Sequence, residues 1–182
     1  AGGADLESNE SFRGRLLLAI RNPLGSGNAG DYEQFTLRDP GVTRVFVRPR
    51  MPERYQITIY PMLDIVNADN NGVPTSADLA RIQDLVDRLR PSAAEAFVAA
   101  VTPAPIEVTF AGVNPAAPEV RSAITAEVSD MILRRATEGG PIRLSWIYEA
   151  ASVAAGEAYH SLISPTGDVI LDPGQLAVPG TV

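Results

Sequence analysis

Apolar residues recur at intervals of three and four along several stretches of the chain, which is the spacing of amphipathic helices. The clearest stretch begins at Thr75, which forms a capping-box pair with Asp78, and it ends at Arg90, directly before a proline. Two more helices are expected, one from Asn114-Pro115 to Gly139-Gly140 and one over 145–155. The three apolar stripes are Leu79, Ile82, Val86 and Leu89; Val120, Ile124, Val128 and Met131; and Trp146, Ile147 and Ala151.

The first forty residues predict two shorter helices. One is capped by Ser8 and runs to Ile20, and a Gly25-Ser26-Gly27 linker follows it. The second covers 31–38 and precedes an Asp39-Pro40-Gly41 turn. The first helix places Phe12, Leu16, Leu17 and Ile20 on one face, and the second carries Tyr32 and Phe35. We expect Tyr32 and Phe35 to be exposed aromatic anchors of an interface.

Strand patterns occur over 43–48 and 56–62, separated by a proline-bracketed turn at 49–52, and again over 159–163. The segment 97–110 is also rich in strand formers, but Pro103 and Pro105 interrupt it, so an edge or bulged strand is expected there. A tail punctuated by Pro and Gly closes the chain. The alternation predicts an α+β fold, a layered sandwich of short mixed strands and amphipathic helices behind an N-terminal helical segment. We divide it into 1–40, 41–113 and 114–182.

The amino-acid composition argues against several classes of function. The 182 residues contain 15 basic side chains, all Arg, and 22 acidic ones, so the net charge is -7 and nucleic-acid binding is not expected. Cysteine is absent, which excludes disulfides and thiolate chemistry. No apolar run is long enough for a membrane span, so membrane insertion is not expected. The chain begins with Ala-Gly-Gly instead of Met, which suggests a piece of a longer protein, with removal of the initiator Met as the alternative.

Two patterns raise the question of a catalytic or metal site. His160 is the single histidine, and no nucleophile motif accompanies it, so we interpret it as a strand residue at a surface or interface. The loop from Asn67 to Asp78 resembles a calcium loop, with a Gly at the sharp turn. Asn67 replaces the usual Asp, Asp78 is shorter than the usual Glu, and Pro74 interrupts the loop. We therefore favour an Asn/Asp turn and expect no metal.

Scattered carboxylates leave a hydrolase of the acid–base kind open as an alternative. They are Asp5, Glu7, Asp64, Asp69, Glu149 and Glu157. A solvated acidic surface is the far better explanation, because any acidic protein contains such pairs. The Gly25-Ser26-Gly27 stretch follows a helix and lacks a Gly-Lys-Ser/Thr, so it is interpreted as a linker and not as a phosphate loop.

Seven segments, in order, carry a resemblance to a known family. They are AGGADLESNESFRGRLLLAI, SGNAGDYEQFTL, DPGVTRVFVRP, GVPTSADLARIQDLVDRLRP, VTPAPIEVTF, EGGPIRLSWIYEAASVAAG and SPTGDVILDPGQLAVPGTV. Together they resemble the baseplate J-like proteins of contractile-tailed bacteriophages, with Phe35 where that family commonly has Trp. Members of the family carry a further N-terminal region, so the resemblance implies a C-terminal two-thirds fragment.

The resemblance implies a structural wedge protein of the tail baseplate, assembled in the host cytoplasm, with no enzymatic activity and no cofactor. Its expected partners are other wedge and hub proteins and copies of itself, and related baseplates also occur in tailocins and secretion machines. The expected interface residues are Tyr32, Phe35 and Arg38, in the family-like N-terminal element. A receptor- or carbohydrate-binding module of a phage or bacterial surface apparatus is the alternative, and it would need exposed aromatic platforms.

Overall fold

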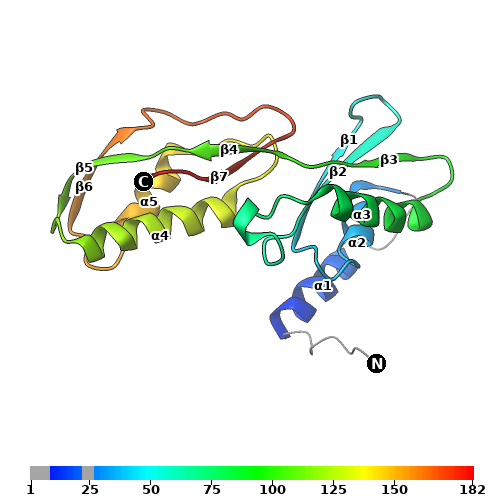
Figure 1. The fold of residues 1–182 in the computed structure, drawn as a ribbon, viewed down its shortest axis with the longest axis horizontal. Helices are drawn as coiled ribbons and strands as arrows, with labels where there is room; N and C mark the ends of the chain where they lie inside the picture. Colours follow the sequence, from blue (N-terminus) through cyan, green and yellow to red (C-terminus); the bar gives the residue numbers. More distant parts are fainter. Residues whose placement is uncertain (1–8, 22–26) are drawn as a thin grey trace. The chain divides into compact units, whose positions relative to one another are not determined.

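The computed structural model describes residues 9–21 and 27–182 (Figure 1). The chain divides into two compact units, Ala1–Ala100 (unit 1) and Val101–Val182 (unit 2). Helices and small sheets occur in both, with parallel as well as antiparallel strand pairs in each unit, which confirms the α+β fold class. The three-part division 1–40, 41–113 and 114–182 stays a prediction about folding units.

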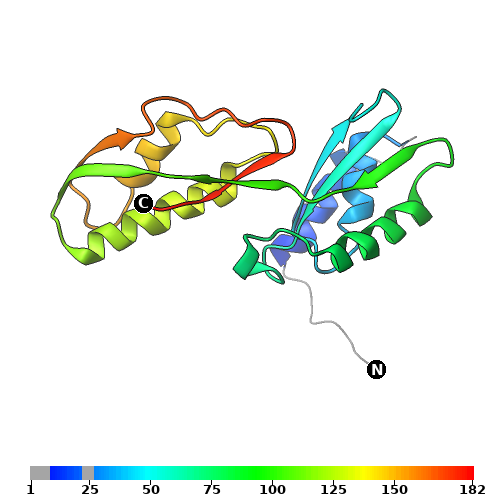
Figure 2. The same cartoon turned by 45° about the horizontal axis from the view of Figure 1, so that its top comes forward.

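Unit 1 contains a three-stranded sheet covered by helices. The strands are β1 (Arg44–Pro49), β2 (Gln56–Met62) and β3 (Glu95–Val98), in the order β1-β2-β3. β1 and β2 are antiparallel, whereas β2 and β3 are parallel because α3 (Ser76–Leu89) makes the crossover between them (Figure 2). A 3-10 turn, η1 (Ala68–Asn70), lies in the loop before α3.

The core of unit 1 lies between the sheet and two helices, α2 (Ala29–Thr36) and α3. The stripe predicted for α3 points inward, with Ile82 and Val86 buried and Leu89 packed against the core. Its ends are also as predicted, because Thr75 is the N-cap and Arg90 is the C-cap. The buried cluster consists of Tyr32, Phe35, Val42, Ile59, Leu63, Ile82, Val86 and Ala96.

The first helix, α1 (Asn9–Arg21), forms where the apolar periodicity predicted it. Its apolar side chains Phe12, Leu16, Leu17 and Ile20 are all exposed. The predicted Ser8 cap lies outside the described residues, as does most of the linker that contains Gly25 and Ser26.

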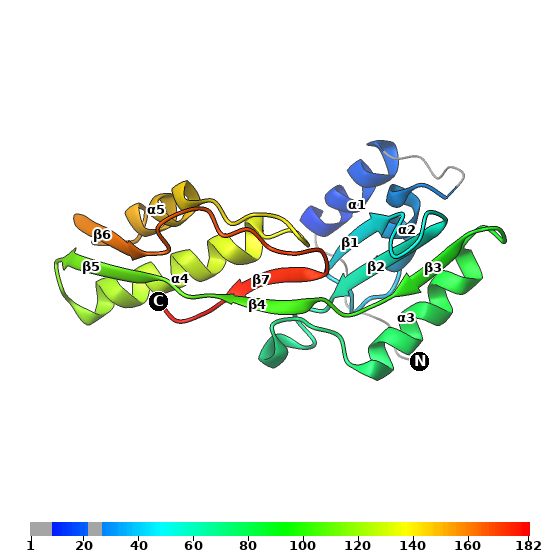
Figure 3. The same ribbon diagram turned by 90° about the horizontal axis from the view of Figure 1, so that it is seen from above.

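Unit 2 packs two helices, α4 (Pro118–Arg135) and α5 (Leu144–Ser152), with two small sheets. One sheet pairs β4 (Thr102–Ile106) with β7 (Gln175–Pro179) in parallel, and the two strands lie side by side in Figure 3. The other pairs β5 (Thr109–Asn114) with β6 (Tyr159–Ser164) in antiparallel fashion. The side chains predicted to face inward from α4, namely Val120, Ile124, Val128 and Met131, are all buried.

Three predictions about the chain after residue 96 are wrong or incomplete. The second long helix does not start at Asn114-Pro115, because Asn114 is the last residue of β5 and α4 begins at Pro118. The β-rich segment 97–110 is not one strand but parts of three, β3, β4 and β5. The tail that is rich in Pro and Gly contains a strand, β7, which was not predicted. β7 pairs with β4 in a two-stranded sheet, so β4 has a partner on one side only and is an edge strand.

Candidate functional site

The residues predicted to form an interface lie in α2, and the structure gives two of them a different role. Asn28 caps this helix by accepting a hydrogen bond from the Asp31 amide at 3.1 Å. The Asp31 carboxylate accepts in return from the amides of Gly27 and Asn28 at 2.8 and 3.0 Å. This capping box fixes the direction of α2 and turns its aromatic face toward the core.

The prediction that Tyr32 and Phe35 are exposed is wrong. Tyr32 is fully buried and Phe35 is 9% exposed, and their rings meet edge to face with centroids 5.8 Å apart. Burial raises the pKa of Tyr32, and the Asp31 charge raises it further, while the Arg90 charge acts in the opposite direction. Neither ring can be a surface anchor, because α3 and the sheet cover the face that carries them.

Arg38 differs from these two rings. Its side chain is exposed just beyond the end of α2, with the guanidinium 5.8 Å from the centroid of the Phe35 ring. The Phe35 ring thus packs against the buried side of the Arg38 guanidinium. A role for Arg38 in an interface stays a prediction.

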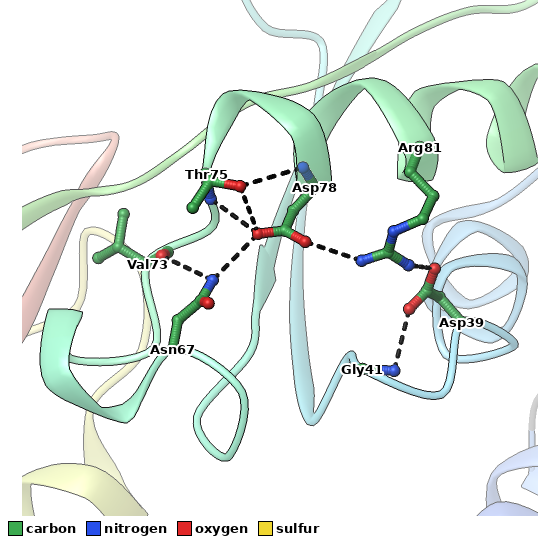
Figure 4. Close-up of polar contacts among 7 residues, drawn as sticks. All are labelled: Asp39, Gly41, Asn67, Val73, Thr75, Asp78 and Arg81. Atoms are coloured by element: carbon green, nitrogen blue, oxygen red, sulfur yellow. Dashed lines mark hydrogen bonds and ion pairs between the residues drawn. The ribbon is translucent and has the colours of Figure 1, made fainter. Parts of the chain in front are cut away.

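A chain of polar contacts joins three segments of unit 1 (Figure 4). Arg81, in α3, pairs with Asp78 at 2.9 Å and also with Asp39 in the turn after α2. Asp78 accepts hydrogen bonds from the amide and the hydroxyl of Thr75 at 3.0 and 2.7 Å, and from Asn67 at 3.1 Å. These contacts, led by those from Thr75, lower the pKa of Asp78. The network fastens the loop before α3 and the turn after α2 to one helix.

The same network uses the side chains that give residues 67–78 the spacing of a calcium loop. Gly72 does adopt a left-handed conformation, with φ of 76°. The side-chain Nδ2 of Asn67, however, donates to the Val73 carbonyl and to the Asp78 carboxylate, so the Asn67 side chain acts here as a donor. The Asp78 carboxylate is occupied by capping α3 and by Arg81. Within residues 9–21 and 27–182, no group of three or more His, Asp or Glu side chains is placed to hold a metal ion.

His160 lies in strand β6, as predicted, but its side chain is buried and does not face a surface. Its side chain is 6% exposed, and Nδ1 lies 2.9 Å from Oε1 of Glu157. Tyr148 stacks on the ring and Phe110 meets it edge-on, with centroids 5.9 and 5.3 Å away. These contacts hold β5, α5 and β6 together.

Of the described carboxylates considered for a hydrolase, Asp64, Glu149 and Glu157 each contact a basic side chain, and Asp69 is exposed. Asp64 pairs with Arg44 at 2.8 Å, and Glu149 with Arg135 at 2.8 Å. The guanidinium of Arg135 also lies 5.4 Å from the Trp146 ring. A cavity beside β5 contains no Asp or Glu side chain among its lining residues, which are Phe110, Gly112, Val113, Arg121, Ile124, Thr125 and Val182.

The turn between β1 and β2 was predicted only as a proline-bracketed connection, with no functional role. It exposes Arg50, Arg54 and Tyr55 together, and Tyr55 is 85% exposed. Arginine and tyrosine are enriched in the energetically important parts of interfaces. The signal available in the sequence was this composition in a short turn.

Comparison with known proteins places both units in one class. The central domain of baseplate J-like proteins matches residues 25–100, and the C-terminal domain of baseplate J-like proteins matches 104–182. The first range lies in unit 1 and the second in unit 2. The chain therefore consists of two successive domains of the phage baseplate class. It belongs to the baseplate J-like family, as the resemblance in the sequence indicated.

Individual relatives agree with this assignment. The chain is 30% identical over 183 residues to a protein called JayE of Escherichia coli K12, and the match spans all of the chain and 68% of that protein. It is 28% identical to protein gp47 of the Mu-like prophage FluMu of Haemophilus influenzae and 24% identical to baseplate protein gp47 of Escherichia phage Mu. The chain spans 53% and 52% of these two proteins, about half their length. Family membership supports a structural role in a phage tail baseplate.

Proposed function

We propose that this chain is a wedge protein of a contractile-tail baseplate and acts through protein–protein contacts. The observation that carries the proposal is the succession of two baseplate J-like domains over nearly the whole chain, 25–100 and 104–182. Its partners in this proposal are other wedge and hub proteins and further copies of itself. Assembly takes place in the bacterial cytoplasm, and the finished protein resides in the tail baseplate.

The described surface supports a role in assembly. Large apolar side chains are exposed in both units, among them Ile65 and Val66 in unit 1 and Val153 and Ile170 in unit 2. Exposed apolar side chains of this size commonly mark contact surfaces when they gather in patches. No helix in the described part of the chain is both long and apolar enough to cross a membrane.

The test is deletion of the gene in a strain that produces the tail particles, followed by complementation. We expect deletion to abolish complete contractile tails in electron micrographs and the intact gene to restore them. Mass spectrometry of the purified particles should find peptides from both units at a copy number comparable to that of other baseplate proteins. Complete tails without this chain would refute the proposal.

The alternative, a receptor- or carbohydrate-binding module, gives a different result in the same experiment. A binding module at the periphery would leave particles that assemble but do not adsorb to the host. Assembled, non-adsorbing particles would therefore favour that alternative over the wedge proposal.

A further inference from the structure

The loop between β2 and α3 contains the dipeptide Asn71-Gly72, which occurs once in the chain. An asparagine followed by glycine is chemically labile, because the backbone nitrogen of the glycine can attack the side-chain amide carbon of the asparagine without hindrance from a Cβ atom. Asn114 cannot react in this way, since the nitrogen of Pro115 carries no proton. The labile pair in this loop is therefore a candidate site of covalent modification.

The shape of the loop favours the asparagine of this pair and requires the glycine. Asn71 has a φ of 53°, in the left-handed region that asparagine adopts more readily than most residues. Gly72 has a φ of 76°, and a Cβ atom added to it would lie 2.5 Å from Oδ1 of Asp64. A larger residue at position 72 would strain the turn and collide with Asp64, so the fold keeps the labile pair.

The same loop restrains the nitrogen that would react. The Gly72 amide donates to the Asn67 carbonyl at 2.9 Å, and the Gly72 carbonyl accepts from the Leu63 amide at 2.7 Å. Gly72 is buried, whereas Asn71 is exposed. Attack on the Asn71 side chain requires the Gly72 amide to lose its proton and to turn away from Asn67. The hydrogen bond between Gly72 and Asn67 must therefore break first.

We propose that Asn71 is a site of spontaneous deamidation, and that opening of the loop 67–73 sets the rate. In the first step a bond forms between the Gly72 nitrogen and Cγ of Asn71, the bond from Cγ to Nδ2 breaks, and ammonia leaves with the proton of the Gly72 amide. Water then adds to either carbonyl of the resulting succinimide ring and opens it. The products are aspartate and isoaspartate, and in isoaspartate the main chain continues through the side-chain carbon.

Side-chain hydrogen bonds keep the loop closed. Nδ2 of Asn67 donates to the Val73 carbonyl and to Asp78, each at 3.1 Å (Figure 4). Nδ2 of Asn70 donates to the Val73 carbonyl at 3.3 Å. Asn67 is a positioning residue, because its carbonyl holds the Gly72 amide and its side chain ties the loop to the first turn of α3. Local opening of a loop requires less free energy than unfolding of a whole domain, so the reaction proceeds from the open loop.

Modification prevents the loop from closing as before. Isoaspartate adds a methylene group to the main chain directly before Gly72, so Gly72 can no longer meet both Asn67 and Leu63. Both products also add a negative charge to a chain whose net charge is -7. The modified loop should therefore be more open than the original one.

Peptide mapping by mass spectrometry tests the inference on the purified chain, so the test does not rest on the proposed function. The chain is incubated at mildly alkaline pH, once folded and once unfolded in urea, and is digested at intervals. We expect Asn71 to deamidate at least about tenfold faster in urea, where the loop no longer restrains Gly72. Labelling by an isoaspartyl methyltransferase should detect isoaspartate among the products. Asn114, which precedes a proline, should keep its amide in both samples.

Two results of this comparison would overturn the inference. Equal rates for the folded and the unfolded chain would show that the loop does not protect Asn71. An unfolded chain in which Asn71 keeps its amide would show that this residue is not a deamidation site at all.

A substitution in the loop supplies a second result. Asn67→Ala removes both side-chain hydrogen bonds but leaves the carbonyl that binds Gly72, so Asn71 of the folded variant should deamidate at least about threefold faster than in the wild type. Asp69→Ala is the matched control and should react at the wild-type rate, because Asp69 is exposed in the same loop. Circular dichroism at the incubation temperature establishes that both variants are folded. A folded Asn67→Ala variant that reacts no faster than the control contradicts the role of the loop, and the comparison in urea stands whether or not this variant folds.

Discussion

Arg81 is the residue on which the polar network of unit 1 depends. It joins Asp78 in its own helix to Asp39, whose side chain is 6% exposed and is otherwise bound by the Gly41 amide at 2.9 Å. Arg81→Met keeps an unbranched, largely aliphatic stem and removes the cation, so a buried carboxylate loses its counter-charge. Because Arg81 is itself 47% exposed, water recovers part of this loss. We expect the free energy of unfolding to fall by about 1–2 kcal/mol, measured by urea denaturation.

Arg88→Met is the matched control for this prediction. Arg88 is exposed in the same helix, and no ion pair joins it to another described residue. Its replacement should change the free energy of unfolding by no more than about 0.5 kcal/mol. Equal losses for the two variants would show that the network contributes nothing beyond the helix itself.

Asp64 gives a prediction about pH. Burial raises its pKa, but hydrogen bonds from Arg44 at 2.8 Å and Thr43 at 2.6 Å outweigh burial, so the pKa of Asp64 is lowered overall. In the unfolded chain an Asp has a pKa of about 3.9. Because the pKa of Asp64 is lower in the folded state, Asp64 stabilises the fold above the unfolded pKa, and this stabilisation is lost as the pH falls through the folded pKa. Asp64→Asn should therefore be less stable than the wild type at neutral pH, with a gap that narrows in acid. Denaturant titrations at several pH values measure the gap, and a gap independent of pH would contradict this account.

At the scale of elements, local chemistry decided what could be predicted. The ends of α3 were predictable because Thr75 and Asp78 cap it and a proline follows Arg90. β7 was not, because it is five residues long, lies among Pro and Gly, and owes its strand form to β4, which is distant in sequence. Long-range pairing of this kind leaves no local signal.

The candidate interface shows a second limit. The spacing of Tyr32 and Phe35 showed that the two rings share a face of α2, but periodicity cannot say whether that face meets solvent or core. α3 and the sheet cover it. The exposure of the turn at Arg50 and Tyr55 likewise depends on which other elements pack near it. The sequence gives the residue types in this turn but not their exposure.

The prolines of β4 give a prediction about this strand. The Thr102 amide donates to the Gly174 carbonyl at the start of the pairing with β7. Because amide direction alternates along a strand, positions 103 and 105 face the open edge, where proline has no N–H to offer. We expect Pro103→Thr together with Pro105→Thr to restore donors at this edge and to increase self-association, measured by light scattering over a range of concentrations.

Pro173→Thr, in the turn before β7, is the control for the edge, because it removes a proline outside any strand. It should scatter light like the wild type. A double variant that remains as monomeric as this control would show that the prolines of β4 do not protect the edge.

At the scale of the whole molecule, the two units have separate cores, and each matches its own family domain. The core of unit 1 contains Ile82, and that of unit 2 contains Leu176, both fully buried. The single tryptophan, Trp146, lies in unit 2, so its fluorescence reports the unfolding of that unit, whereas far-UV circular dichroism reports both. Domains with their own cores commonly unfold as separate cooperative units.

Two cavity-forming substitutions test this separation. Ile82→Ala should destabilise unit 1 by about 2–4 kcal/mol, which shifts part of the circular dichroism transition but not the midpoint of Trp146 fluorescence. Leu176→Ala should destabilise unit 2 by about the same amount and should shift the midpoint of Trp146 fluorescence. If Ile82→Ala moves both signals equally, the two units unfold as one cooperative unit. If only the expected signal moves in each variant, the chain is built from two domains that fold separately, and each can be altered for assembly experiments without loss of the other.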